Sequence, residues 1–196
     1  MLSIDMTDFG FEDLVPEEEV DVVEDDFDGE LPEEPKSKLG EIYQLGNHRL
    51  MCGDSTDPEM VAKLMDGNKA DMVFTDPPWN VNYGDQDEDN PQGYKPRKIL
   101  NDFMGTEEFK DFMYSVFKNM NEASKDGACT YVVMSAQEWG NMMLTLAMND
   151  YHWSSTIIWN EDRLVLSRKD YHTKYEPIYY GWKSGASRLH PLQDRK

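Results

Sequence analysis

Residues 70–79 read Ala-Asp-Met-Val-Phe-Thr-Asp-Pro-Pro-Trp. The apolar run from Met72 to Thr75 predicts a short buried strand. The two prolines after Asp76 have no backbone N–H to donate to a sheet or a helix, so the chain must leave the strand there. In α/β sheets, ligands bind just beyond the carboxyl ends of strands. We therefore expect a binding site at this turn.

The turn offers a distinctive set of groups. Asp76 supplies a carboxylate, Pro77 and Pro78 supply rigid carbonyl groups, and Trp79 supplies a flat aromatic face. This set suits a planar base held by its exocyclic amine, whose lone pair is delocalised into the ring and is a poor nucleophile. Two acceptors aimed at the two amine hydrogens favour a more tetrahedral nitrogen that can attack. We predict that these acceptors are the Asp76 side chain and the Pro77 carbonyl.

Three further consequences follow from this chemistry. Stacking of the base on Trp79 would contribute about 1–3 kcal/mol. Attack on an activated methyl group is direct, so the protein has to supply placement and electrostatics rather than a nucleophile. A base in a duplex would first have to be flipped out of its stack. The simpler alternative is a turn that ends a strand and exposes a Trp.

Strand and helix patterns alternate on both sides of this turn, which predicts an α/β fold with a mostly parallel sheet that finishes in an antiparallel hairpin. The amphipathic pattern after Thr106, which we expect to cap its helix, is especially regular. The predicted elements are a hairpin at 40–54, a helix at 56–67, the strand at 72–75, a helix from 106 that Gly127 ends, a strand at 128–134, a helix at 136–148, and strands at 153–159 and 175–182.

Acidic residues are concentrated at the start of the chain. Residues 1–35 hold fifteen Asp and Glu and no Lys or Arg, so they carry most of the net charge of −20. We interpret residues 1–38 as a disordered acidic linker and residues 39–196 as the folded domain. A tail that mimics DNA is the alternative for the acidic segment.

Basic residues gather in the last part of the chain. Eight Lys and Arg against three acids stand in residues 163–196, so this segment is the candidate for phosphate contact; a solvated surface is the alternative. The polar segment 80–105 either closes over a bound base or is a plain surface loop.

Other classes of protein are disfavoured. Cys52 and Cys129 show no metal spacing and indicate a reducing compartment, and the four histidines form no ligand pair. We find no signal peptide and no long apolar run, and expect a cytoplasmic protein without a membrane span or a metal.

Several of these segments together resemble the amino-methylating DNA methyltransferases whose catalytic half precedes their cofactor half. The shared segments are 50–55, 73–81, 157–159, 171–172 and 175–183. The acidic start is similar to linkers that join ParB-like domains to such methylases. The resemblance implies part of a Rossmann-like class I methyltransferase sheet, S-adenosylmethionine as cofactor, DNA as partner, and a bacterial or phage origin, as in restriction-modification.

The resemblance also implies roles for individual residues. The catalytic motif would be Asp76, Pro77 and Trp79, with Pro78 as spacer. Asp54 would contact the adenine end of the cofactor, and Asp76 is also expected to bind the cofactor. The remaining expected site residues are Trp79, Tyr83 and Trp159 around the target base, and Arg163, Arg168, Lys169 and Lys174 on DNA. Family members often carry a Lys soon after that second Trp; here Asn160 and Glu161 follow it, so no role is carried over to them.

One expected feature of the family is missing from the sequence. The methionine part of the cofactor binds a Gly-rich turn in the family, and none of the thirteen glycines here forms a Gly-x-Gly pair. We therefore expect a truncated or split enzyme that binds cofactor poorly alone, needs a complementary C-terminal fragment, and leaves the strand at Met72 with an open edge.

The leading prediction is the catalytic half of a DNA adenine-N6 methyltransferase. Cytosine-N4 methylation uses the same chemistry, but the family more often has Ser at the position of Trp79 for cytosine. A non-catalytic remnant that binds DNA or a partner chain, and an RNA adenosine-N6 methyltransferase, are the alternatives.

Overall fold

The computed structural model describes residues 35–82, 100–161 and 172–189, and the unit that contains the fold begins at Ser37. Its first elements are the strands β1 (Ile42–Leu45) and β2 (His48–Met51), which form the predicted hairpin, and the helix α1 (Pro58–Met65). Asp57 caps α1 by accepting hydrogen bonds from the backbone N–H groups of Glu59 and Met60. Asp66, in the left-handed conformation, ends the helix.

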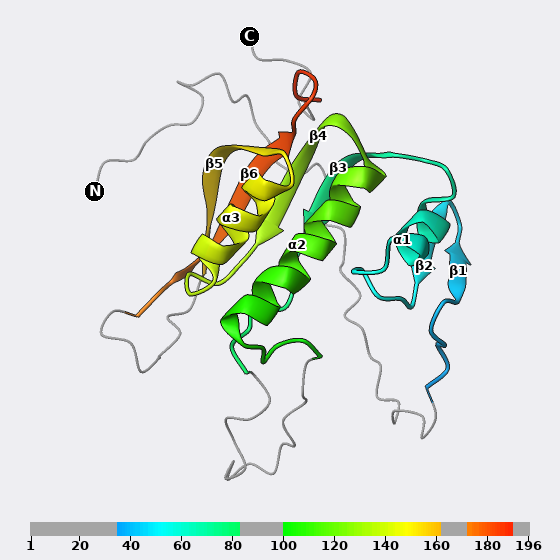
Figure 1. Ribbon diagram of the computed structural model, residues 1–196, viewed down its shortest axis with the longest axis horizontal. Helices are drawn as coiled ribbons and strands as arrows, with labels where there is room; N and C mark the ends of the chain where they lie inside the picture. Colours follow the sequence, from blue (N-terminus) through cyan, green and yellow to red (C-terminus); the bar gives the residue numbers. More distant parts are fainter. Residues whose placement is uncertain (1–34, 83–99, 162–171, 190–196) are drawn as a thin grey trace, which may run out of the picture. The chain divides into compact units, whose positions relative to one another are not determined.

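A four-stranded sheet follows, in the order β3-β4-β6-β5 (Figure 1). Its strands are β3 (Ala70–Thr75), β4 (Ser124–Val133), β5 (Tyr151–Asn160) and β6 (Tyr175–Lys183). β3 is parallel to β4, whereas β6 is antiparallel to both of its neighbours. The predicted α/β class and the antiparallel pairing of β5 with β6 are confirmed. The antiparallel strand is inserted between β4 and β5 rather than added at the edge, because it pairs with both of them.

Two helices, α2 (Thr106–Ala123) and α3 (Trp139–Met148), cover one face of the sheet (Figure 1). Two predicted boundaries need correction. The cap of α2 is Gly105, without a side-chain hydrogen bond, and Thr106 is the first helical residue. Gly127 lies inside β4 with a φ of 79°, since the strand already begins at Ser124.

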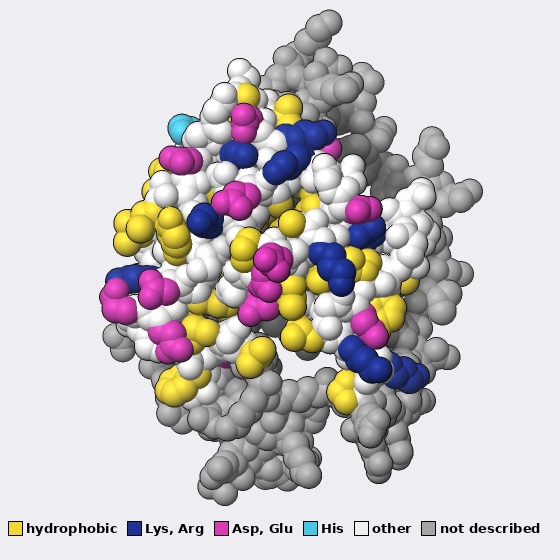
Figure 2. Space-filling model, turned by 45° about the vertical axis from the view of Figure 1, so that its right-hand side comes forward, with side chains coloured by type: hydrophobic (Ala, Val, Ile, Leu, Met, Phe, Trp, Pro, Cys, Tyr) yellow, Lys and Arg dark blue, Asp and Glu magenta, His cyan; other side chains and the backbone are white. Residues whose placement is uncertain are grey.

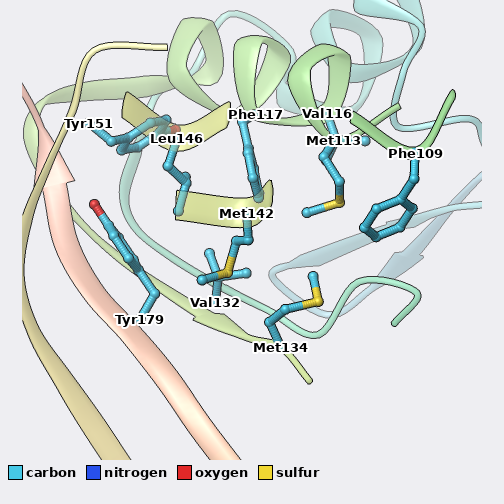
Figure 3. Packing of buried hydrophobic residues seen from close by; sticks show 10 residues of the cluster. All are labelled: Phe109, Met113, Val116, Phe117, Val132, Met134, Met142, Leu146, Tyr151 and Tyr179. Atoms are coloured by element: carbon cyan, nitrogen blue, oxygen red, sulfur yellow. The ribbon is translucent and has the colours of Figure 1, made fainter. Parts of the chain in front are cut away.

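The hydrophobic core lies between these helices and the sheet. Both helices and the strands β4, β5 and β6 contribute to it, as Figure 3 shows. Its members are Phe109, Met113, Val116, Phe117, Val132, Met134, Met142, Leu146, Tyr151 and Tyr179. The amphipathic face of α2 predicted from the sequence supplies four of these side chains. Val132 near the end of β4 and Met134 just beyond it belong to the same core, which holds this strand end beside the turn that follows β3.

The opposite face of the sheet remains exposed along several strands. Met72 and Phe74 of β3 are 52% and 60% exposed, and Trp159 of β5 is 57% exposed. Phe74, Tyr131 and Tyr180 stack across three neighbouring strands, with ring centroids 6.0 and 5.0 Å apart. We call this surface the open face; it comprises Met72, Phe74, Tyr131, Ile157, Trp159, Tyr180 and Trp182.

Candidate active site

The Asp-Pro-Pro-Trp turn leaves the sheet at the carboxyl end of β3. Thr75, the last residue of that strand, pairs with Val132 of β4, so the turn begins where two parallel strands end together. Asp76 is exposed and accepts a hydrogen bond from the indole Nε1 of Trp79 at 2.8 Å. No basic side chain of the described residues forms a salt bridge with it. The carboxylate is thus outside the core and available to a ligand.

Pro77 and Trp79 hold the turn against the rest of the domain. Pro77 is buried, and the half-buried indole of Trp79 packs against the hydrophobic core. The indole ring packs against the core on one side and donates to Asp76 from its nitrogen, and both contacts hold the turn in place without a ligand. Such preorganisation is what positioning and electrostatic catalysis require.

Asn80 fastens the turn to the segments that directly precede both helices of the core. Its backbone is left-handed, with a φ of 57°, a conformation that Asn tolerates better than most residues. Its side-chain Oδ1 accepts from the Met104 N–H at 2.6 Å, and its Nδ2 donates to the Met104 carbonyl at 3.2 Å and to Glu138 Oε1 at 3.1 Å. Sequence reasoning assigns Asn80 no role, although an Asn directly after a forced turn is a signal for this backbone conformation.

Asp102 connects the two ends of the polar segment that follows the turn. It is only 4% exposed, and its Oδ1 accepts from the Val81 N–H at 3.2 Å. Its backbone carbonyl accepts from the Asn82 N–H at 2.8 Å. The two ends of the predicted loop are therefore joined at the turn, while the predicted lid residues 83–99, including Tyr83, lie outside the described residues.

A small pocket opens beside Trp79. It measures about 80 Å³ and is lined by Trp79, Met134, Ser135, Ala136, Thr173, Tyr175, Glu176 and Pro177. Pockets that enclose a small molecule are usually roughly 300–1,000 Å³, so this one suits one edge of a base rather than a whole ligand. Burial, and then the charges of Glu161 and Asp76, raise the pKa of Glu176 above its ordinary value.

Trp159 lies next to this pocket without lining it. It is the cross-strand partner of Glu176 and shares the open face of the sheet.

Asp54, the predicted cofactor residue, lies in a different pocket. Its Oδ1 accepts from the backbone N–H and the hydroxyl of Thr56, at 2.8 and 2.7 Å. The pocket around it measures about 160 Å³ and is otherwise lined by Met51, Gly53, Ser55, Met60, Val61 and Leu64. It shares no lining residue with the pocket beside Trp79, and Asp76 lines neither of the two pockets. A larger pocket of about 210 Å³ between α1 and α2 contains no predicted site residue.

The predicted DNA contacts are only partly described. Arg163, Arg168 and Lys169 lie outside the described residues, and Lys174 is exposed just before β6. On the side of the molecule shown in Figure 2, Lys and Arg side chains alternate with Asp and Glu, and neither sign forms a continuous region in the described part of the chain. No described group of His, Cys, Asp and Glu is arranged to hold a metal, and no described helix is long and apolar enough to cross a membrane.

The sequence matches the DNA methylase family N6_N4_Mtase over residues 70–195, and the chain therefore belongs to this family. This confirms the resemblance to amino-methylating DNA methyltransferases, a family that depends on S-adenosylmethionine.

Among solved structures, the fold is similar to M1.HpyAVI in its complex with S-adenosylmethionine, with 13% identity and a TM-score of 0.45. The match covers 73% of this chain and 61% of M1.HpyAVI. For TTHA0409 of Thermus thermophilus, assigned as a DNA modification methylase, the identity is 17%, the TM-score is 0.43, and the shares are 72% and 54%. The chain thus spans little more than half the length of these proteins. A comparison with curated proteins found no match.

Proposed function

We propose that the chain is the catalytic part of a DNA methyltransferase that transfers a methyl group from S-adenosylmethionine to the N6 amine of adenine. The observation that carries this proposal is the exposed Asp76 carboxylate, held by Trp79 at the end of β3 in a member of the DNA methylase family. Asp76 would accept one amine hydrogen and the Pro77 carbonyl the other, while Trp79 stacks on the base.

The residues of the turn would act by holding and polarising the amine. Bound S-adenosylmethionine supplies the activated methyl group. With both of its hydrogens directed at acceptors, the amine nitrogen presents its lone pair for direct attack, and after methylation it loses one proton. Neither step needs a covalent bond between the substrate and the protein. Asp76 would act only as a hydrogen-bond acceptor, and an exposed carboxylate suits this role.

The pocket around Asp54 would hold the adenine end of the cofactor. Its apolar walls suit a flat ring, and the carboxylate has one oxygen engaged by Thr56 and can use the other as an acceptor. Residues for the methionine end are not evident, since the sequence lacks a Gly-x-Gly pair. We therefore also propose a complementary C-terminal methyltransferase fragment as the partner.

Adenine rather than cytosine is proposed because Trp79 occupies the fourth position of the motif. Residues 1–38 are proposed as a linker and 39–196 as the catalytic domain of a cytoplasmic, bacterial or phage-encoded enzyme of the restriction-modification kind. Arg163, Arg168, Lys169 and Lys174 are proposed to contact phosphates, and Tyr83 and Trp159 to contact the base.

The test is methyl transfer from tritiated cofactor to DNA, with the full chain alone and with the complementary fragment. We expect N6-methyladenine as the product and at least a 100-fold loss of transfer in Asp76→Ala, because the amine loses its charged acceptor. DNA binding should change less than twofold. Glu122→Gln, an exposed change on α2, is the matched control. Full activity of Asp76→Ala, or N4-methylcytosine as the product, would contradict the proposal.

A further inference from the structure

The pocket beside Trp79 contains a second carboxyl group that the proposed chemistry does not use. Glu176 is the second residue of β6 and lines this pocket together with Trp79. Trp79 in turn donates its indole hydrogen bond to Asp76. Glu176 therefore lines the pocket itself, and Asp76 is hydrogen-bonded to the indole that forms another part of its wall.

The charges around Glu176 come from three segments of the chain. Asp76 lies on the turn after β3, Glu161 follows the end of β5, and His172 and Lys174 precede β6. Partial burial has the largest effect, and the two neighbouring carboxylates add to it; all three raise the pKa of Glu176. Lys174 is exposed, and its backbone carbonyl accepts a hydrogen bond from the Glu161 N–H at 3.0 Å. These surroundings therefore raise the fraction of neutral carboxylic acid at Glu176 relative to a Glu side chain in water.

A neutral carboxylic acid differs from Asp76 in what it can bind. It carries an O–H donor, whereas a carboxylate only accepts. In adenine the amine stands next to the ring nitrogen N1, which is an acceptor, and in cytosine it stands next to N3. If Asp76 and Pro77 take the amine hydrogens, this ring nitrogen needs a donor from the pocket.

We propose that Glu176 reads the target base by donating a hydrogen bond from its protonated carboxyl group to the ring nitrogen beside the amine. This inference rests on the proposed function and adds a specificity-determining residue to it. Guanine and thymine carry an N–H at the corresponding ring position, so they would oppose a donor with a donor. Glu176 would thereby disfavour the bases that carry an N–H at this ring position.

The test compares binding to single-stranded thymine oligonucleotides that carry one central adenine or one 1-deazaadenine, in which N1 is replaced by C–H. Single strands remove the cost of base flipping. One hydrogen bond corresponds to a preference for adenine of about 3- to 10-fold in the native chain. Glu176→Ala should lose this preference. Glu176→Gln should keep it, because the amide N–H can replace the carboxyl donor.

The pH dependence provides the second readout. The native chain should lose its preference for adenine as the pH rises through the pKa of Glu176, since the carboxylate has no hydrogen to donate. Glu176→Gln should show the same preference at every pH. Glu122→Gln should behave as the native chain, and circular dichroism of each variant confirms folding.

Several results would overturn the inference. These are no preference in the native chain, a preference that survives in Glu176→Ala or is lost in Tyr175→Phe instead, a preference that follows 7-deazaadenine, or an unchanged pH dependence in Glu176→Gln. They are separable from failure of the proposed function. If Asp76→Ala abolishes methyl transfer while Glu176→Ala still prefers adenine, only the role of Glu176 is wrong.

Discussion

Asp76 and Asn80 have different tasks although they are only four residues apart. Asp76 exposes its carboxylate and has the Trp79 indole as its donor, whereas Asn80 uses both ends of its amide on partners in the two helical segments. The exposed position of Asp76 was predictable from the sequence, because the two prolines force the chain out of the sheet directly after it. The contacts of Asn80 were not, since Met104 and Glu138 are distant from it along the chain.

Replacing Asn80 should therefore affect the position of the turn more than its chemistry. We expect Asn80→Gly to lower the free energy of unfolding by about 1–3 kcal/mol through lost hydrogen bonds. Asn80→Ala should cost about 1 kcal/mol more, because a Cβ disfavours the left-handed backbone. Urea unfolding of both variants measures the difference. Equal stability of Asn80→Ala and the native chain would show that the side-chain hydrogen bonds of Asn80 do not hold the turn.

Among the elements, β3 is one of the two edge strands of the four-stranded sheet, and β5 is the other. In the described part of the chain β3 has a partner strand on one side only, and two of its large apolar side chains are exposed. Apolar periodicity was sufficient to predict the strands and helices themselves, because each pattern is local. The insertion of β6 between β4 and β5 depends on pairing between distant segments, which no local pattern encodes. An exposed apolar strand edge favours association with another chain.

The complementary fragment should consequently dock at β3 and the open face. On mixing the two chains, we expect slower amide hydrogen exchange in β3 and loss of the complex in Phe74→Lys, which places a charge on this surface. Leu144→Lys, an equally exposed change on the outer side of α3, is the control and should leave the complex intact. A complex that tolerates Phe74→Lys and leaves exchange in β3 unchanged would place the partner elsewhere.

For the whole molecule, the fold and the family agree with the sequence-based prediction. The predicted site residues, in contrast, are divided between two places in the structure. The turn at Asp76 and the pocket with Glu176 lie together, but Asp54 lies in a separate pocket. The proposed role of Glu176 was not predictable from the sequence. Glu176 comes close to Trp79 and Asp76 only when β6 pairs between β4 and β5. The acidic balance of the chain does not argue against DNA as partner, since most of it belongs to residues 1–35.

The central claim is that the Asp76 carboxylate accepts a hydrogen from the amine of the target base. The most direct measurement is the NMR signal of that amine in a single-stranded oligonucleotide with one ¹⁵N6-labelled adenine, bound to the full chain. We predict two separate amine proton signals, with one shifted downfield by the charged acceptor, and loss of that shift in Asp76→Asn. A downfield shift that is the same in Asp76→Asn, or no change of the amine signals on binding to the native chain, would contradict this account.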